Sequence, residues 1–309
     1  MSVSHADAKR YDRQIRLWGL EGQRRIQQAR ILFIRPRGLM TEVIKNVVLA
    51  GVCSVTLWDD ARIHADAFEF GCNFFLQPPV HESEFSVENM RPHVHALNPQ
   101  VHVETWTDAI DAEAIRRRTS HHDFDVVCLT HIDWDLTLSV SEHCHASHLK
   151  LYVAACDALE AWIFCDVGKH HEWMPPGKQE QQHGEWLKLT DAFDHHCQVL
   201  KNSKKSVKAL RRVYPPVFLR LLLHYLHRQG KVEDLLQRQA LFPDRPELAD
   251  MLLPLKYLQE WTPNVDMSAV CSIVGGILAQ DMIHVIAGSH RPIRSFFLFD
   301  GREFSGILV

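Results

Sequence analysis

One segment early in the chain, residues 31–60, has the residue types and order of a nucleotide-binding unit. Four apolar residues at 31–34 precede the turn RPRGLM, a helical apolar pattern and a second apolar run that ends before Asp59. In dinucleotide-type folds such a turn binds phosphate through backbone N–H groups, and a carboxylate about 20 residues later binds a ribose hydroxyl. Gly38 and Asp59 are therefore the candidate nucleotide-binding residues.

The turn itself is poorly suited to phosphate. Gly38 is its one glycine, Pro36 has no N–H to donate, and the Met40 side chain would fill space that a phosphate needs. Arg35 and Arg37 could attract phosphate by charge alone. We therefore interpret this turn as vestigial, in a segment that still specifies the sheet and its packing.

Strand and helix patterns alternate over most of the chain. Short apolar runs predict buried strands, and apolar residues three to four positions apart predict the helices between them. This rhythm predicts an α/β fold with a doubly wound, Rossmann-like sheet. The expected strands are 31–34, 54–58, 101–103, 125–130, 151–155, 161–165, 295–299 and 306–309, and the expected helices are 10–29, 39–48, 135–148 and 267–287. Gly275 and Gly276 weaken the last helix, which indicates close approach of another backbone.

The composition changes between residues 173 and 265. A polar stretch, PPGKQEQQHGE, leads into helical patterns, one with a basic face and the next strongly apolar. We interpret the basic face as a solvated helix surface rather than a targeting signal. The predicted organisation is a first sheet part at 1–172, a helical insertion at 173–265, and a return to the sheet domain at 266–309. The basic residues are Lys201, Lys204, Lys205, Lys208, Arg211 and Arg212.

Composition bounds the class of protein. A chain of 309 residues that is 46% hydrophobic can bury a full core. The net charge of −4 gives no reason to expect nucleic acid or an anionic membrane as a partner. The polar N-terminus does not read as a signal peptide, and no apolar run reaches the roughly 18 residues of a membrane span. We expect a soluble intracellular protein.

Cysteine and histidine are plentiful, yet they do not predict a metal site. The eight cysteines contain no C-x-x-C pair, which indicates reduced, buried thiols rather than a disulfide framework or a zinc knuckle. Among the 21 histidines, His143, His145 and His148 lie near Cys144, and on a helix Cys144 and His148 would share a face. No second pair stands at a supporting spacing, so we expect no metal site.

Three stretches together are similar to one family. They are YDRQIRLWG at 11–19, EVIKNVVLAG at 42–51, and AVCSIVGGILAQ at 269–280 followed by FFLFDG at 296–301. They resemble the activating enzymes of ubiquitin-like proteins, which have a ThiF/MoeB-like fold, and within that family the smaller, Aos-type subunits of SUMO-activating heterodimers. The resemblance runs from about residue 8 to residue 308 and is weakest over 170–260.

The family fold is built as two related halves, of which one adenylates and the other is degenerate. This chain departs from the active pattern at Arg35 and Met40, and has CNFFL at 72–76 where an active half reads Asn-x-x-Arg-Gln-Phe. It has no lysine at the expected place near 83–88, and Cys197 lacks the context of the family's catalytic cysteine. The resemblance therefore implies the half without the catalytic cysteine, inactive alone.

The resemblance also implies a candidate catalytic residue, Arg13, that acts in trans on ATP bound by the partner. Adenylation builds charge on phosphate oxygens, which a guanidinium can engage bidentately. Arg16, on the same helix face, is given only a supporting role. The implied partners are a larger catalytic-cysteine subunit, in an obligate heterodimer, and a SUMO-like modifier. The implied cofactors are ATP and Mg²⁺, bound mainly by the partner, and the expected location is the nucleus, with the cytoplasm as a second compartment.

Other functions stay open at this stage. The degenerate half of an activating enzyme for another modifier would share these motifs, although the insertion of roughly 90 residues favours the SUMO reading. A homodimeric ThiF/MoeB-like sulfur-carrier adenylating enzyme would need an intact phosphate site in each chain. A nicotinamide dehydrogenase would need G-x-G-x-x-G and would leave YDRQIRLWG unexplained.

Overall fold

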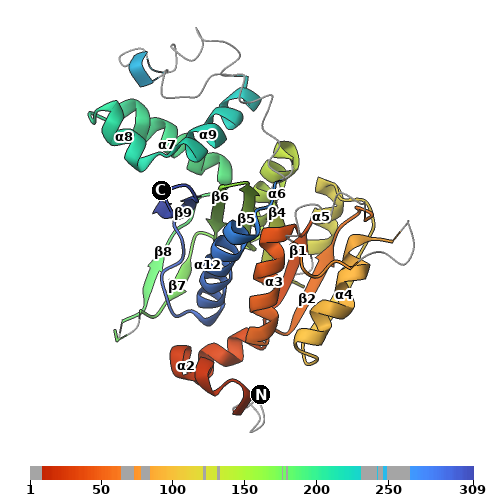
Figure 1. Cartoon of the computed structure of the whole chain (residues 1–309). Helices are drawn as coiled ribbons and strands as arrows, with labels where there is room; N and C mark the ends of the chain where they lie inside the picture. Colours follow the sequence, from red (N-terminus) through yellow and green to blue (C-terminus); the bar gives the residue numbers. More distant parts are fainter. Residues whose placement is uncertain are drawn as a thin grey trace.

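An eight-stranded sheet, in the order β10-β9-β6-β5-β4-β1-β2-β3, runs through the computed structural model (Figure 1). The strands are β1 Arg30–Ile34, β2 Ser54–Trp58, β3 His102–Trp106, β4 Val126–Thr130, β5 Lys150–Asp157, β6 Glu160–Asp166, β9 Ser295–Asp300 and β10 Ser305–Leu308. The structure describes residues 9–63, 73–77, 84–120, 123–130, 133–175, 177–178, 180–230, 242, 246–248 and 265–309.

The strands from β3 to β5 are parallel and form the doubly wound part of the sheet. Their order, β3-β2-β1-β4-β5, places β1 at the centre between β2 and β4. The crossover helices are α3 Gly38–Ala50, α4 Ser86–Leu97, α5 Ala112–Thr119 and α6 Trp134–Ala146. Strands β6, β9 and β10 then extend the sheet with antiparallel pairs. The predicted α/β, doubly wound fold is confirmed.

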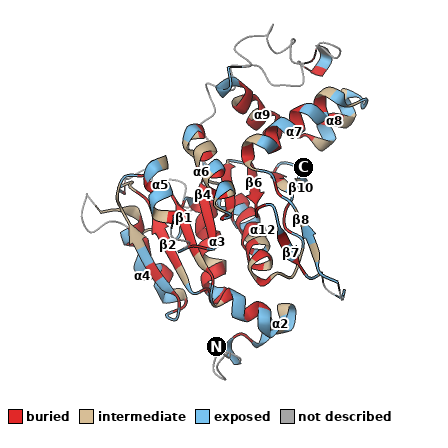
Figure 2. Ribbon diagram, turned by 180° about the vertical axis from the view of Figure 1, so that it is seen from behind, coloured by how far each residue is buried: buried red, intermediate tan, exposed pale blue. Residues whose placement is uncertain are grey.

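Alternate residues of the central strand enter two separate cores. Ile31 and Phe33 pack with α3, α4 and α12 Ser268–Ala287 on one face. Leu32 and Ile34 pack with α5, α6 and the helices of the insertion on the other face. Burial on both faces is what an unbroken apolar strand predicts, and Figure 2 shows the buried strands between two layers of helices.

The region predicted as a helical insertion contains α7 Leu189–Asn202, α8 Val207–Val213 and α9 Pro216–Arg228. Phe193 of α7 and Phe218 of α9 contact Phe296 of β9, with ring centroids 5.0 and 5.2 Å apart, so these helices share the core of the sheet. A small hairpin, β7 His171–Trp173 and β8 Gln182–Gly184, stands at the start of this region and was not predicted. The basic residues Lys204, Lys205, Lys208, Arg211 and Arg212 are exposed, as a solvated face requires.

Helix α12 packs against α3, β6 and α2 Asp12–Ile26. A Cβ at Gly275 would lie 2.6 Å from the Glu42 Cβ and 2.8 Å from the Leu39 carbonyl oxygen, so the predicted close approach is confirmed there. It is wrong for Gly276, where a Cβ would meet nothing within 4 Å. Of the described helices, α12 alone is long and apolar enough to cross a membrane; its contacts are those of a core helix.

Candidate functional site

The phosphate-binding position at the start of α3 is taken by the chain itself. The backbone N–H of Gly38, the first residue of α3, donates a hydrogen bond of 2.7 Å to the Asp266 Oδ2. A helix N-terminus carries partial positive charge and attracts anions, which is why phosphates bind at such turns. Here the Asp266 carboxylate occupies the place of the anion.

The other predicted nucleotide ligands are also engaged within the chain. Asp59 is buried and accepts hydrogen bonds from the Ser86 hydroxyl at 2.9 Å and the Ala61 N–H at 3.1 Å. Burial raises the pKa of Asp59, and these two hydrogen bonds oppose that rise. Arg35 lies 3.4 Å from the Asp60 carboxylate. Asp59 is therefore not available to bind a ribose hydroxyl, and Arg35 is not available to bind a phosphate.

Two apolar side chains of the segments compared with a nucleotide site are buried in the core. Met40 is buried beside the turn, as its place in the sequence predicts. Phe75 is buried and contacts Phe74, in the stretch where an active half carries polar phosphate ligands. Cys72 and Ser83, which belong to the two stretches that differ from an active half, lie outside the described residues. The described residues of this pocket do not fit ATP.

The YDRQIRLWG motif is anchored at its first residue. Tyr11 is buried, and its hydroxyl accepts a hydrogen bond of 3.0 Å from the Asn98 Nδ2. Gly51 ends α3 with φ 83°, and a Cβ there would lie 2.3 Å from the Tyr11 Oη. Gly51 is thus required both by its left-handed backbone and by the close approach of the tyrosine.

A second anchor holds the middle of α2. The Trp18 Nε1 donates to the Gln23 Oε1 at 3.1 Å, and the fully buried Gln23 donates through Nε2 to the Ala50 carbonyl at 3.1 Å. Gly19, with φ 77°, breaks the helix between the two. Together with Tyr11, this contact fixes α2 against the C-terminal end of α3.

The anchoring leaves Arg13 pointing to solvent. Arg13 is exposed, and no ion pair or hydrogen bond to its guanidinium is found in the part of the chain that the structure describes. Arg16 instead lies 2.8 Å from Asp12, a pair exposed on both sides and therefore weak. Arg13 is the cation of this helix that is free to meet a ligand from outside.

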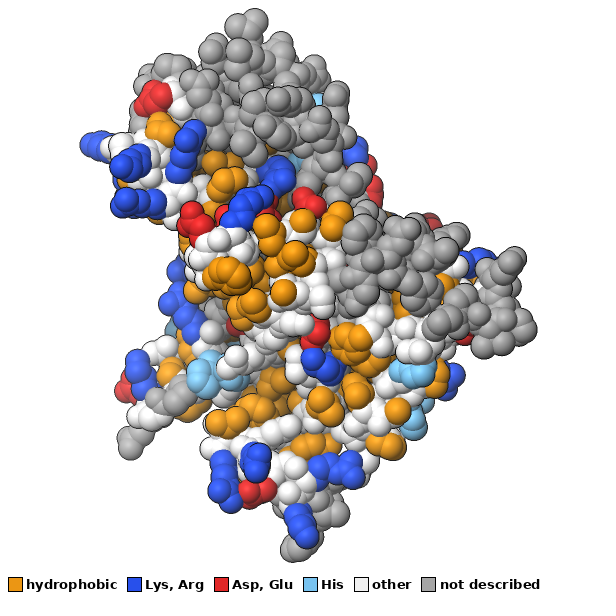
Figure 3. Space-filling view, in the orientation of Figure 1, with side chains coloured by type: hydrophobic (Ala, Val, Ile, Leu, Met, Phe, Trp, Pro, Cys, Tyr) orange, Lys and Arg blue, Asp and Glu red, His pale blue; other side chains and the backbone are white. Residues whose placement is uncertain are grey.

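A groove lies beside Arg13, between α2, α3 and α12. It has a volume of about 600 Å³, and Leu17 and Leu49 on its rim are 73% and 47% exposed. The Gln14 Oε1 is buried here without a donor among the described residues. Figure 3 shows hydrophobic side chains gathered over α3 and α12, above the charged residues of α2. The groove was not predicted, because the residues that line it come from three helices far apart in the sequence, and no local pattern links them.

The residues weighed as a local metal cluster do not converge. His143 is 2.7 Å from the Thr119 hydroxyl, and His145 is 2.8 Å from the Asp166 carboxylate. The thiol of Cys144 is buried in the core, which raises its pKa far above the usual range. Cys197 is likewise buried in the core between α7 and the sheet, so its thiol is not presented to a modifier.

Comparison with known proteins identifies the family. The ThiF family model matches residues 11–307. The chain belongs to the ThiF family. It is 30% identical to SUMO-activating enzyme subunit 1 of Xenopus tropicalis over 99% of the chain and 96% of that protein. It is 28% identical to SUMO-activating enzyme subunit 1 of Homo sapiens over 99% of the chain and 95% of that protein.

Two solved structures share the fold of this ThiF family member. The selenomethionine PaaA crystal structure has a TM-score of 0.56 at 15% identity, covering 98% of this chain and 82% of PaaA. The crystal structure of E. coli MccB with AMPCPP and MccA has a TM-score of 0.60 at 12% identity, covering 97% and 70%. At these identities the likeness shows the fold alone.

The structure separates the predicted site residues of this ThiF family member. Gly38 and Asp59 belong to the pocket at the N-terminal end of α3, whereas α2 is fixed at its C-terminal end (Figure 1). Thirteen helical residues span about 20 Å. Arg13 is therefore not placed to act on a ligand in its own chain's pocket.

Proposed function

We propose that the chain is the subunit without the catalytic cysteine in a heterodimeric SUMO-activating enzyme. It supports ATP-dependent adenylation of a SUMO-like modifier, and its transfer to a thioester, by the larger partner. The supporting evidence is the ThiF family match and the near full-length similarity to proteins named SUMO-activating enzyme subunit 1. The observation that carries the proposal is an exposed, unpaired Arg13 on the opposite end of α3 from a pocket that is closed by Asp266.

Arg13 acts in trans in this proposal. ATP and Mg²⁺ would be held mainly by the partner, where ATP would supply the α-phosphate and Mg²⁺ would neutralise charge on the phosphate oxygens. Arg13 brings a planar, permanently charged guanidinium, whose two parallel N–H donors match phosphate oxygens. A trans-acting arginine contributes about 10³ to 10⁵ in rate in related phosphoryl transfers. Arg16 stays paired with Asp12 and only supports the position of the helix.

The groove between α2, α3 and α12 is the surface to which the larger subunit is proposed to bind. Burying Leu17 and Leu49 there removes apolar surface from water, which favours association. A donor from the partner would also satisfy the buried Gln14 Oε1. The groove adjoins Arg13, so one docking event covers the apolar face and brings the arginine to the partner.

Reconstitution tests the proposal. The purified chain and the larger subunit are assayed for modifier-dependent pyrophosphate exchange, separately and together. The lone chain should show none, and the Arg13→Ala complex should assemble normally but exchange at least about tenfold more slowly. Arg24→Ala is the matched control, because it removes an exposed arginine with no assigned role from the same helix and should leave exchange unchanged. Exchange by the lone chain, or full activity of the Arg13→Ala complex, would refute the assigned role.

The rival functions are separated by the same reagents. A homodimeric sulfur-carrier adenylating enzyme needs an open phosphate site in every chain, and the Gly38 to Asp266 hydrogen bond argues against it. Exchanging the modifier in the assay distinguishes SUMO from other ubiquitin-like proteins. We also propose a nuclear location with the cytoplasm as a second compartment; a fluorescent fusion excluded from nuclei would contradict it.

A further inference from the structure

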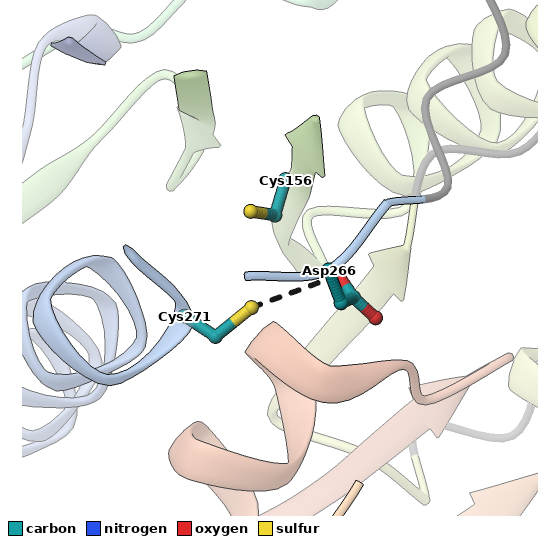
Figure 4. Close-up of side chains that lie close together, drawn as sticks. All are labelled: Cys156, Asp266 and Cys271. Atoms are coloured by element: carbon teal, nitrogen blue, oxygen red, sulfur yellow. Dashed lines mark hydrogen bonds between the residues drawn. The ribbon is translucent and has the colours of Figure 1, made fainter. Parts of the chain in front are cut away.

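Two thiols and a carboxylate meet beside the vestigial pocket. Cys156 comes from the end of β5, Asp266 from the segment before α12, and Cys271 from the first turn of α12 (Figure 4). One ligand atom from each, the two sulfurs and a carboxylate oxygen, lie within 4.8 Å of one another. Among the described residues this is the one group of three or more such side chains that is close enough to share a cation.

The distances suit a thiophilic metal. Zinc binds thiolate at about 2.3 Å and carboxylate at about 2.0–2.2 Å, so neighbouring ligand atoms in a tetrahedral site lie roughly 3.5–3.8 Å apart. The Cys271 Sγ is already 3.7 Å from the Asp266 Oδ1. The remaining sulfur needs to move by at most about 1 Å, which a small rotation of the side chain provides. Two thiolates favour Zn²⁺ or Cd²⁺ over Mg²⁺ or Ca²⁺.

The surroundings fix the orientation of the Asp266 carboxylate. The second carboxylate oxygen of Asp266 accepts the Gly38 N–H, which leaves Oδ1 facing Cys271. Such a hydrogen bond to a ligand fixes its orientation and is part of many metal sites. Cys271 lies in the first turn of α12, and Asp266 caps α3, so two helix N-termini face the group. Helix N-termini carry partial positive charge, which attracts anionic groups such as metal-binding carboxylates.

We propose that Cys156, Asp266 and Cys271 form a binding site for a single thiophilic divalent cation, with Zn²⁺ as the physiological candidate and a water as the fourth ligand. The site lies at the carboxyl edge of the parallel sheet, where the degenerate pocket no longer fits a phosphate. A bound cation would tie the end of β5 to the start of α12. This inference does not rest on the proposed function, since neither Arg13 nor the partner takes part.

Spectroscopic titration of the full chain tests the site. The reduced, metal-free protein is kept in a phosphine reductant and titrated with Cd²⁺ while the ultraviolet thiolate-to-metal charge-transfer band is recorded. The wild type should saturate at one Cd²⁺ per chain, and Zn²⁺ should displace it. Cys156→Ser and Cys271→Ser should lose the band, whereas Cys53→Ser, which alters an exposed thiol elsewhere, should keep it. Asp266→Asn should weaken binding by at least about tenfold.

A second measurement on the unaltered chain covers the case in which a cysteine variant fails to fold. Native mass spectrometry of the reduced wild-type chain with one equivalent of Zn²⁺ should show one bound ion, and Zn²⁺ should raise the midpoint of thermal unfolding. The proposal is overturned if the band is absent in the wild type, if it survives both cysteine substitutions, or if the unaltered chain neither takes up Zn²⁺ nor is stabilised by it. A disulfide between Cys156 and Cys271 in the protein before reduction, followed by no metal uptake after reduction, would also overturn it.

Discussion

The contact between α12 and α3 gives a sharp prediction, because two adjacent glycines face different surroundings. Gly275→Ala would place its Cβ 2.6 Å from the Glu42 Cβ and 2.8 Å from the Leu39 carbonyl oxygen. The carbonyl is backbone, and Glu42 is held by the Ser272 hydroxyl at 2.9 Å and by Lys45, so neither yields easily. The two helices must separate, at an overpacking cost of about 1–3 kcal/mol. The higher helix propensity of alanine relative to glycine offsets up to about 1 kcal/mol of this cost.

We therefore expect Gly275→Ala to lower the free energy of unfolding by about 1–2 kcal/mol. Gly276→Ala is the matched control: its Cβ meets nothing within 4 Å, so it should raise stability by up to about 1 kcal/mol. Urea denaturation of the lone chain, followed by circular dichroism, measures both. In a thermal scan each kcal/mol corresponds to about 1.5 °C for a chain of this length. A Gly275→Ala chain as stable as Gly276→Ala would refute the packing argument.

Two further outcomes follow from the structure. Burial raises the pKa of Asp281 to about 6, although the Tyr152 hydroxyl and the Ile293 N–H donate to it at 2.6 and 2.9 Å. The pKa of Asp281 in the folded chain exceeds its ordinary value of 3.8, so the folded chain binds this proton more tightly than the unfolded chain does. Proton binding therefore adds up to about 3 kcal/mol to the free energy of unfolding below pH 4, and this contribution is lost as the pH rises through about 6. Asp281→Asn should remove that part of the slope in urea titrations from pH 4 to 7, and an unchanged slope would contradict the assignment. Leu49→Asp should weaken association with the larger subunit by about 10- to 100-fold in Kd, measured by surface plasmon resonance, with little loss of its own stability. Phe304→Asp, at a residue 80% exposed in the turn before β10, should bind like the wild type, and equal binding by both variants would show that the groove is not the interface.

The main elements could be predicted because their apolar patterns are strong. Ile31 and Leu32 enter opposite cores, and an unbroken apolar run is the signature of such a strand. The helix predicted at 39–48 matches α3, Gly38–Ala50, which ends at Gly51 in the left-handed conformation. The β7–β8 hairpin was missed because its strands are three residues long and mostly polar, so they carry no period to detect.

The site could be predicted only where its residues are close in sequence. The turn around Gly38 indicated a lost phosphate site, and the structure adds what fills it. Gly38 and Asp266 are 228 residues apart, and no local pattern links them. Cys156 and Cys271 likewise come from separate elements, so the absence of a C-x-x-C pair says nothing about their meeting in space.

The two ends of helix α3 have different neighbours. Its N-terminal end adjoins the pocket that Asp266 closes, and its C-terminal end contacts α2, which carries the exposed Arg13. The C-terminal end of α3 holds α2 in place, because Gly51 packs against Tyr11 and the Ala50 carbonyl accepts a hydrogen bond from Gln23. Its N-terminal end must still satisfy the Gly38 N–H, since a buried donor without a partner costs about 1–3 kcal/mol. In this chain the Asp266 carboxylate supplies that partner. We infer that Asp266 stabilises the N-terminal end of α3 without a bound phosphate, and α3 in turn supports α2, the helix that carries Arg13.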